Sequence, residues 1–306
     1  MLQTSASLVV YQTPAAELQQ LLQTLQSAVD VWVLVDNSVD QKQEAEERKQ
    51  ATLACGGIYV PSPTNVGFGG GHNVALSYLR DAGFATRYHL MVNPDIVFDP
   101  AILSPLTQVL NERPDVGWVM PQVRSGDGSV QPLCKLLPTP FDLLGRRFVP
   151  SFVRRLLGLS QDDYEMKGIA DLSSEDVPFL SGCFVFARYD LLQKANGFDS
   201  RYFMYMEDVD LSRRFRRYGK LLYWPEVHVI HGHRRGSYHD LRLTLLHIRS
   251  AILYFQRWGW FSDRERSALN AQALRSLRNE IRFAHSAERS RAESMVEPRS
   301  WNTPHG

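Results

Sequence analysis

Residues 31–38 read VWVLVDNS, an apolar, β-branched run that ends in three small polar residues. Such a run is typical of a buried strand closed by a turn. Upstream, the apolar run LVVY at residues 8–11 predicts a second strand. Between the two, residues 17–29 carry leucines at the three- and four-residue steps of an amphipathic helix.

The same alternation continues downstream. We expect a charged helix over residues 41–53, a strand over 58–60, a glycine-rich loop over 65–71 leading into a helix at 72–81, and a strand over 88–92. Strands that alternate with helices predict a doubly wound parallel α/β sheet with helices on both faces. Ligands of such sheets bind at the carboxyl ends of the strands, where this chain carries Asp36, Asn65 and Asp95.

The chain from residue 101 onward follows a less regular pattern. Helices are expected over 101–112, 189–195, 208–218 and most of 241–287, and extended segments over 116–120, 179–187, 220–224 and 227–230. Residues 126–176 combine prolines, a Leu/Phe/Arg-rich piece and an acidic stretch. This composition predicts a long irregular segment of the kind that often carries substrate contacts.

The overall composition is that of a globular protein, with 306 residues, 44% hydrophobic and 22% charged. No apolar run approaches the length of about 18 residues that a membrane span needs, and no secretory signal is expected from the first residues. The three cysteines are widely spaced and odd in number, which predicts neither a disulfide framework nor a zinc site. We therefore expect a cytoplasmic location.

The net charge of +1 conceals an asymmetry. Residues 211–306 hold 18 Lys and Arg against 8 Asp and Glu, and 17 of those 18 are Arg, a side chain suited to phosphate. Nucleic acid, anionic lipid or a phosphorylated substrate would each explain such a segment, as would an ordinary solvated helix surface. Nucleic acid is not expected as a partner, because no recognisable binding motif accompanies the charge.

The basic segment also carries an apolar stripe. Its members recur at three- and four-residue steps and are Leu241, Leu245, Ile248, Ile252 and Phe255. The stripe predicts a helix that docks on the rest of the protein or lies on a bilayer. Anionic lipid at the inner face of a membrane would complement the arginines, so peripheral, salt-sensitive membrane contact without insertion is expected.

The glycine-rich stretch at residues 65–73 reads NVGFGGGHN. Its spacing is not G-x-G-x-x-G, and it follows the third expected strand, so a nicotinamide dinucleotide site is not indicated. Glycines at such a point let the backbone approach a phosphate or a sugar closely. A tight structural turn is the alternative interpretation.

Three carboxylates stand within four residues in the stretch MEDVDL at residues 206–211. The aromatic-rich approach over residues 198–206 would partly desolvate them, which raises a carboxyl pKa and favours a general base near neutral pH. A capping role at a helix start is the alternative, and Asp210 is the carboxylate that fits it best.

Asp95 follows an apolar strand in the sequence NPD, and His231 lies in VIHGH. Mg²⁺ and Mn²⁺ take one or two protein carboxylates and complete their shell with phosphates and water. Catalytic zinc is not expected, since no H-E-x-x-H accompanies the histidines. Asp95 with one imidazole on a divalent cation is the more plausible arrangement.

Taken in order, these stretches resemble glycosyltransferase family 2, and within it the bacterial rhamnosyltransferase type. The matching stretches are Thr13, VLVDNS (33–38), NVGFGGGHN (65–73), NPD (93–95), FLSGCFVFAR (179–188), GFDSRYFMYMEDVDLSRR (197–214) and VIHGH (229–233). The resemblance covers roughly residues 7–240. It implies an α/β GT-A fold over 1–240, with a Rossmann-like nucleotide-sugar-binding half (about 1–122) and an acceptor and catalytic half (123–240) around a mixed central sheet. A basic, helical extension would then fill residues 241–306.

The resemblance also implies roles for individual residues. The donor-binding set is Thr13, Asp36, Asn65, Gly67, Gly69, Gly70, Asn73, Asn93 and Asp95. Asp95 and His231 would share Mg²⁺ or Mn²⁺ as cofactor, Asp208 would be the general base beside Glu207, and the acceptor would meet Gly182, Cys183 and Trp224. One departure is notable: Asn93 replaces the first acid of the family's D-x-D, so a metal would be held by fewer carboxylates.

The activity implied is inverting transfer of a sugar from a nucleotide-sugar donor to a glycan or lipid-linked acceptor, in the building of a bacterial surface glycan. L-rhamnose from dTDP-rhamnose is the expected donor sugar, with UDP-galactofuranose as an alternative. A catalytically silent GT-A-like module that binds nucleotide or glycan is the rival from another class. A nucleotidyltransferase is disfavoured because no phosphate loop follows the first strand. The sequence leaves an oligomer open.

Overall fold

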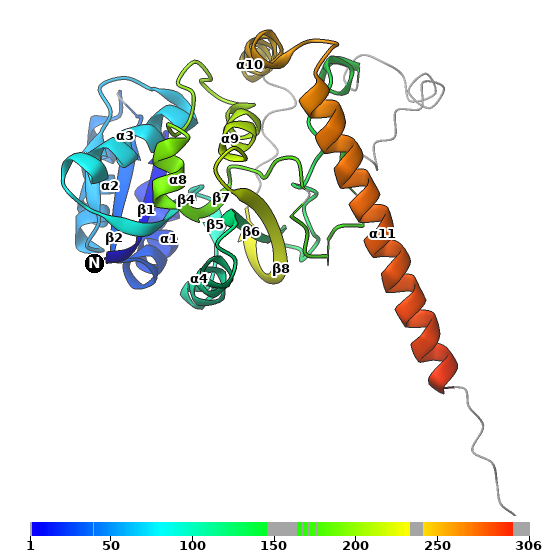
Figure 1. Ribbon diagram of the computed structural model, residues 1–306. Helices are drawn as coiled ribbons and strands as arrows, with labels where there is room; N and C mark the ends of the chain where they lie inside the picture. The colour runs from blue at the N-terminus through cyan, green and yellow to red at the C-terminus, as the bar shows by residue number, and fades with distance from the viewer. Residues whose placement is uncertain are drawn as a thin grey trace, which may run out of the picture.

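The structure, a computed structural model, describes residues 2–38, 40–145, 164–166, 168–170, 172–175, 177–232 and 241–295. An eight-stranded sheet in the order β3-β2-β1-β4-β7-β6-β8-β5 runs through it (Figure 1). The strands are β1 (Leu2–Val10), β2 (Val31–Asp36), β3 (Ile58–Pro61), β4 (Thr86–Val92), β5 (Ile96–Val97), β6 (Val116–Arg124), β7 (Phe184–Arg188) and β8 (Lys220–His231).

The first four strands are parallel, as the alternation of strands and helices predicts. β7 then pairs antiparallel with both β4 and β6, while β6 and β8 are parallel to each other. The sheet is therefore mixed, which confirms the expected α/β fold around a mixed central sheet.

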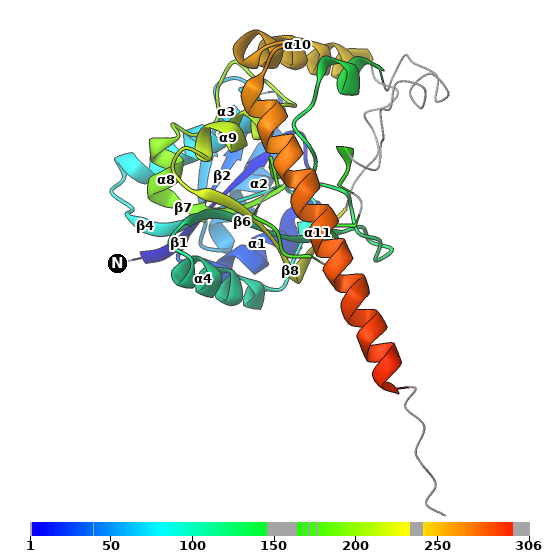
Figure 2. The same cartoon turned by 45° about the vertical axis from the view of Figure 1, so that its right-hand side comes forward.

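Helices cover both faces of the sheet (Figure 2). They are α1 (Ala15–Ala28), α2 (Lys42–Ala54), α3 (Gly67–Asp81), η1 (Pro100–Ile102), α4 (Leu103–Glu112), η2 (Phe141–Gly145), α8 (Tyr189–Lys194), α9 (Glu207–Phe215), α10 (Leu241–Trp258) and α11 (Arg264–Met295). The apolar stripe of α1 packs with α4 on one face. Side chains of α3, α8 and α9 pack on the other face, so the predicted leucine periodicity of α1 identifies a core-facing side.

Several expected boundaries are wrong: the strand expected over 179–187, for example, begins only at Phe184. Residues 67–71 are not a loop, because α3 already begins at Gly67. The two extended segments at 220–224 and 227–230 are one strand, β8, whose pairing with β6 shifts register between Pro121 and Gln122. Pro225 lies at that shift, and a proline cannot donate a ladder hydrogen bond.

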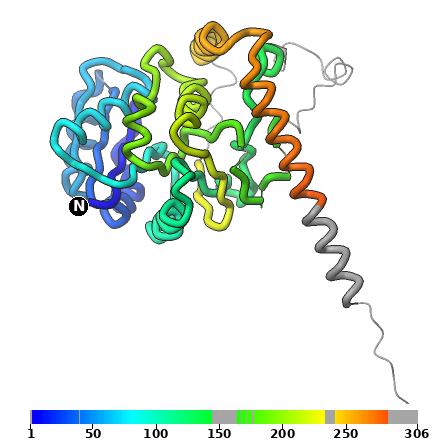
Figure 3. Tube along the Cα trace, in the orientation of Figure 1, coloured from blue at the N-terminus to red at the C-terminus, as the bar shows by residue number. Residues whose placement is uncertain are grey.

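The C-terminal helices pack against α9 and the segment that leads to it (Figure 3). Ala251, Tyr254 and Phe255 of α10 join a core cluster with Tyr202 and Val209. The predicted stripe is therefore divided: Phe255 is buried in that cluster. The exposed fractions of the other members reach 80% at Leu241, 66% at Leu245 and 40% at Ile252.

Candidate active site

A strained turn places the three carboxylates Glu207, Asp208 and Asp210, here called the acidic motif, at the start of α9. Tyr205 and Met206 both have left-handed backbone conformations, with φ of 68° and 66°. Such angles cost free energy in residues other than glycine and are concentrated at functional sites. They turn the chain so that Glu207 and Asp208 stand in the first turn of the helix, where the macrodipole favours negative charge.

Asp208 is held by two backbone N–H groups. Gly182 donates to its Oδ2 over 3.1 Å, and Val209 donates to its Oδ1 over 2.8 Å. Burial raises the pKa of Asp208, while these two hydrogen bonds act to lower it. The carboxylate is thus a stronger base than an exposed aspartate, and its charge has donors to stabilise it.

Glu207 has fewer such donors than its neighbour, and the one backbone hydrogen bond that acts to lower its pKa comes from its own N–H. It is buried, and its Oε2 has no hydrogen-bond partner among the residues that the structure describes. Burial, and then the nearby charge of Asp208, raise the pKa of Glu207. Two adjacent carboxyl groups titrate together, so the N–H donors at Asp208 favour negative charge there, and the raised pKa of Glu207 favours its protonated form.

Cys183 lies between the acidic motif and the end of β4. Its carbonyl accepts the N–H of Asn93 over 3.0 Å. Burial raises the pKa of the Cys183 thiol to about 12, and the charges of Asp208 and Asp95 both add to the shift. The charges of the two carboxylates that the sequence assigns to base and metal therefore both act on one residue beside the carboxyl end of β4.

Asp95 and His231 meet across the β5–β8 pair. Ile96 is in register with His231, Gly232 donates its N–H to the Asp95 carbonyl over 2.8 Å, and Nε2 of His231 lies 3.3 Å from Oδ1 of Asp95. Next to them, the buried Oδ1 of Asn93 has no partner in the described part of the chain. His233 lies outside the described residues.

This donor set fits a divalent cation that shares its shell with substrate. Cis ligands of an octahedral cation at ~2.1 Å lie about 3 Å apart, close to the Asp95–His231 separation. Within the described ranges, no group of three or more His, Cys, Asp or Glu side chains could hold a metal ion. A cation here would therefore need phosphate and water oxygens to complete its coordination.

At the carboxyl end of β2, the Asp36 carboxylate is surrounded by three hydrogen-bond donors. Its carboxylate accepts from Arg48 Nε over 2.7 Å, Tyr59 over 2.7 Å and the Ser38 N–H over 2.8 Å. Burial alone would raise the pKa of Asp36, but these hydrogen bonds lower it overall. Arg48 also donates to the Thr13 carbonyl over 3.2 Å, which ties the two predicted nucleotide-contacting residues together.

Sequence reasoning missed Arg48 and Tyr59. Arg48 lies in a helix crowded with charged residues, and Tyr59 lies in a short strand, so neither position carries a signal of its own. Both are recognised only when folding brings them to Asp36.

The glycines of α3 serve close packing. A Cβ on Gly67, which has φ of 78°, would lie 2.0 Å from the Phe203 carbonyl, and a Cβ on Gly69 would lie 2.7 Å from the Phe198 side chain. Asn65 accepts the Gly67 N–H over 3.0 Å. The glycines thus let the N-terminus of α3 lie directly against the segment that leads to Glu207. A Cβ on Gly70 would meet only Val66, at 3.1 Å.

Three further predicted residues have structural partners. The Asn73 side-chain amide donates to the Phe198 carbonyl over 2.7 Å and accepts the Phe198 N–H over 2.9 Å. Trp224 is half-buried and packs against the core on the α1 face. Gly182 lies against both Phe68 and Asp208, with no room for a large side chain. Their donor and acceptor roles remain predictions.

Asp210 does not act as a simple helix cap. It is fully buried and accepts from Arg214 Nε over 2.7 Å and from Trp258 Nε1 over 2.9 Å. The first bond stays within α9 and the second joins α9 to α10. Asp210 therefore anchors the C-terminal helices to the helix that carries Asp208.

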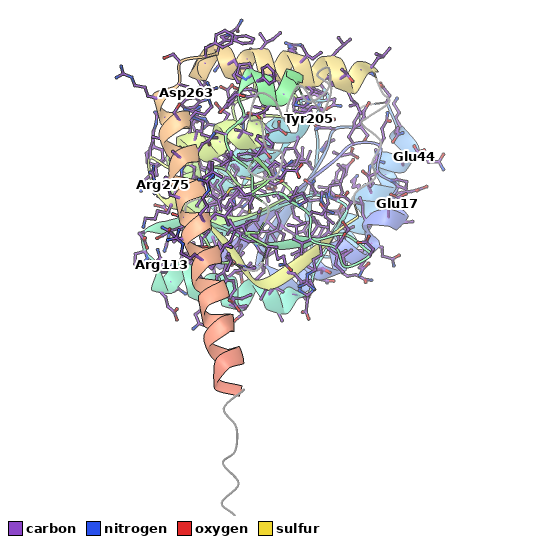
Figure 4. The ribbon with its side chains drawn as sticks, turned by 90° about the vertical axis from the view of Figure 1, so that its right-hand side faces the viewer. Glu17, Glu44, Arg113, Tyr205, Asp263 and Arg275 are labelled. Atoms are coloured by element: carbon purple, nitrogen blue, oxygen red, sulfur yellow. The ribbon has the colours of Figure 1, made fainter. Side chains whose placement is uncertain are left out.

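A second buried contact reinforces this junction. Arg213 on α9 donates from both terminal nitrogens to Asp263, over 2.7 and 3.0 Å, and lies 4.0 Å from the Trp258 ring centroid. Figure 4 shows Asp263 at the end of α11 nearest α10, and Tyr205 beneath α10.

Among the described helices, none is long and apolar enough to cross a bilayer.

Comparison with known proteins finds relatives that align with most of the chain. No protein-family model matches the chain. It is 28% identical over 297 residues to an N-acetylglucosaminyl-diphospho-decaprenol L-rhamnosyltransferase of Mycobacterium tuberculosis, covering 92% of this chain and 94% of that protein. It is also 28% identical over 218 residues to rhamnosyltransferase WbbL of Escherichia coli, covering 68% of this chain and 75% of that protein.

Solved structures share the fold. TarS of S. aureus, residues 1–349, matches 89% of this chain and 70% of its own length with a TM-score of 0.51 at 16% identity. Together with the sheet topology and the acidic motif, these comparisons define a glycosyltransferase with an α/β GT-A fold. Within that class the chain is similar to the rhamnosyltransferases, as the resemblance to glycosyltransferase family 2 implies.

Proposed function

We propose that the protein transfers L-rhamnose from dTDP-rhamnose, with inversion, to a lipid-diphosphate-linked acceptor during synthesis of a bacterial surface glycan. The observation that carries this proposal is the Asp208 carboxylate, held by the Gly182 and Val209 N–H groups beside the buried Glu207, whose Oε2 has no partner among the described residues. Inverting transfer is a single displacement and needs one base on the acceptor hydroxyl. A base positioned in this way is worth roughly 10²–10⁴ in rate.

Asp208 takes the proton of the acceptor hydroxyl as its oxygen attacks the anomeric carbon. The bond from that carbon to the diphosphate oxygen breaks, and the nucleoside diphosphate leaves with the bonding electrons. Glu207, being neutral, does not compete for the proton. Cys183 is kept as a thiol by its raised pKa and is not a nucleophile in this reaction.

Asp95 and His231, next to Asn93, are the residues that would hold Mg²⁺ or Mn²⁺. When bound, such a cation neutralises charge on the leaving diphosphate. Asp95 contributes the carboxylate and His231 an imidazole nitrogen, which compensates in part for the missing acid at Asn93.

The relatives support the donor and the acceptor. The mycobacterial relative is named for transfer of L-rhamnose to N-acetylglucosaminyl-diphospho-decaprenol, and it aligns over nearly all of this chain. An acceptor on a lipid diphosphate would be presented at a membrane surface. On the outward side of α10, Leu241 and Leu245 are exposed beside Arg242 and Arg249, a mixture suited to an anionic leaflet.

A donor panel tests this proposal. Purified protein is incubated with Mn²⁺ and dTDP-rhamnose, UDP-galactofuranose, UDP-glucose or GDP-mannose, and binding, donor hydrolysis and transfer to a synthetic lipid-diphosphate N-acetylglucosamine are measured. We expect dTDP-rhamnose to be used at least about tenfold faster than the others, with product of inverted anomeric configuration by NMR. Preference for UDP-galactofuranose would overturn the donor assignment. Binding of a donor without hydrolysis or transfer would favour the catalytically silent module.

A further inference from the structure

The side-chain amide of Gln131 contacts His231 at two points. Its Nε2 lies 3.1 Å from the His231 carbonyl oxygen, and its Oε1 lies 3.0 Å from His231 Nδ1. A turn after β6 makes this approach: Gln131 donates its N–H to the Val123 carbonyl over 2.8 Å, and Val123 is in register with Val229 on β8. Gln131 thereby reaches the last residue of β8 from the neighbouring strand.

The chemistry of these two contacts fixes the orientation of the amide. A backbone carbonyl can only accept a hydrogen bond, so the Gln131 atom facing it must be the NH₂ group. The atom facing the imidazole is then the amide oxygen, which can only accept. His231 Nδ1 must therefore carry a hydrogen and donate it to Gln131.

A hydrogen on Nδ1 also determines the state of the other ring nitrogen, Nε2. In a neutral imidazole with hydrogen on Nδ1, Nε2 presents a lone pair. That nitrogen lies 3.3 Å from Oδ1 of Asp95, so in the neutral ring two electron-pair donors face each other, whereas a protonated ring would donate Nε2–H to Asp95. Such a pair is complementary to a cation. Histidines that ligate metals are held in the same manner, by a second-shell acceptor on the far ring nitrogen.

We infer that Gln131 is a positioning residue that holds His231 as the Nδ1–H tautomer and thereby directs Nε2 with Asp95 toward a divalent cation at the donor diphosphate. This inference rests on the proposed function, since the Asp95–His231 pair is its proposed cation site. Gln131 belongs to none of the motifs in the sequence, and only the turn after β6 brings it to the site.

The test reads the tautomer directly. Protein with ¹⁵N-labelled histidine is studied by two-bond ¹H–¹⁵N NMR without metal, in mildly basic solution, and His231 is assigned by loss of its signals in His231→Gln. We expect protonated Nδ1 and unprotonated Nε2 in the wild type and in Gln131→Glu, which keeps the acceptor. Gln131→Leu should move His231 toward the Nε2–H tautomer that imidazole prefers in water. Ser125→Ala is the matched control, because Ser125 Oγ accepts from the same Gln131 Nε2 over 3.2 Å without touching the ring.

Mn²⁺ affinity measured by electron paramagnetic resonance with dTDP present gives the second readout. We expect Gln131→Leu to weaken it 10–100-fold, as loss of second-shell partners typically does, and Ser125→Ala to leave it within about twofold. A wild-type His231 with its hydrogen on Nε2, or an unchanged tautomer in Gln131→Leu, would overturn the inference. Equal losses of affinity in Gln131→Leu and Ser125→Ala would overturn it as well. A wild type that has the Nδ1–H tautomer but binds no Mn²⁺ refutes the proposed cation site and, with it, the role of Gln131 toward a cation.

Discussion

Gly182 donates its backbone N–H to Oδ2 of Asp208 over 3.1 Å, across a sequence separation of 26 residues. The contact joins the segment before β7 to the first turn of α9, and it places the negative charge of the acidic motif on Asp208. Glu207, the preceding residue, has a backbone hydrogen bond only from its own N–H, and its Oε2 has no partner among the described residues; burial and the charge of Asp208 raise its pKa to about 8. The assignment of the base follows from this asymmetry between two neighbouring carboxyl groups.

Removing the Asp95 carboxylate should weaken donor binding in a metal-dependent manner. In Asp95→Ala, we expect the affinity for the nucleotide sugar to fall about tenfold or more with Mn²⁺ but to change little in EDTA, because the carboxylate acts through the cation. Isothermal titration of both proteins in both buffers makes the comparison. If EDTA leaves wild-type affinity and activity intact, the proposed cation does not take part.

Two buried histidines, His72 on α3 and His89 on β4, should make stability depend on pH. Burial lowers the pKa of His72 and of His89 to about 3. The Ser7 hydroxyl forms one hydrogen bond with His72 Nδ1, over 2.7 Å, and another with His89 Nε2, over 2.9 Å. The folded pKa lies below the unfolded value of about 6.5. The stability that depends on keeping these two rings neutral is therefore fully present above pH 6.5, and it is lost as the pH falls from 6.5 toward 3.

For each pH unit that the solution is acidified within that window, each of these histidines should lower the free energy of unfolding by about 1.4 kcal/mol. Urea unfolding at pH 7, 6 and 5 measures the slope. His89→Gln should flatten it by about half, whereas His228→Gln, at an exposed position, should leave it unchanged. A wild-type free energy that is flat from pH 7 to 5 would contradict this account of the two rings.

Asp210 should matter for stability through the C-terminal helices. Asp210→Ala leaves the Arg214 guanidinium without its carboxylate and Trp258 Nε1 without its acceptor. Breaking a buried ion pair from one side typically costs about 3–5 kcal/mol. The exposed Asp190–Lys194 pair on α8 is the control, where Asp190→Ala should cost less than about 1 kcal/mol. Urea unfolding compares the two, and equal effects would show that Asp210 is no anchor.

The exposed residues of α10 should carry membrane association. Truncation at residue 240 is unsuitable as a test, because it would uncover the core around Tyr202 and Val209 that Tyr254 and Phe255 close. In the full chain, Leu241→Ser combined with Leu245→Ser should reduce co-sedimentation with anionic liposomes severalfold. Leu53→Ser on α2, 55% exposed, is the matched control and should not.

Each arginine near the anionic surface contributes about 1 kcal/mol, so wild-type binding should also fall with salt and with neutral lipid. Binding that ignores lipid charge, salt and the two leucines would show that α10 has an ordinary solvated surface.

Much of the fold follows from local patterns. The apolar runs at β2 and β4 and the leucine spacing of α1 predict those elements because their periodicity reflects the buried sheet and its covering helices. The start of α3 at Gly67 was not predicted, since glycines disfavour a helix locally. Here the close approach of Phe203 and Phe198 selects them, and that contact joins segments far apart in the sequence.

The residues of the site likewise fall into two groups, those that a local sequence motif predicts and those that only the fold reveals. Asp95, Asp208 and His231 stand in recognisable motifs, and the structure brings Asp95 and His231 together. Arg48 and Gln131 carry no local signal, because their roles depend on partners from other strands. Asp210 was expected as a cap from its place in the first turn, but Trp258, from a helix far along the chain, determines its role.

The most direct test of the central claim is single-turnover sugar transfer by Asp208→Asn and Glu207→Gln, each with its donor affinity measured separately. Asparagine keeps the shape of the base without its basicity, so transfer by Asp208→Asn should fall at least about a hundredfold with donor affinity little changed. Glutamine resembles protonated Glu207, so Glu207→Gln should stay within about tenfold of the wild type. Near-normal transfer by Asp208→Asn, or a hundredfold loss confined to Glu207→Gln, would contradict the assignment of Asp208 as the base.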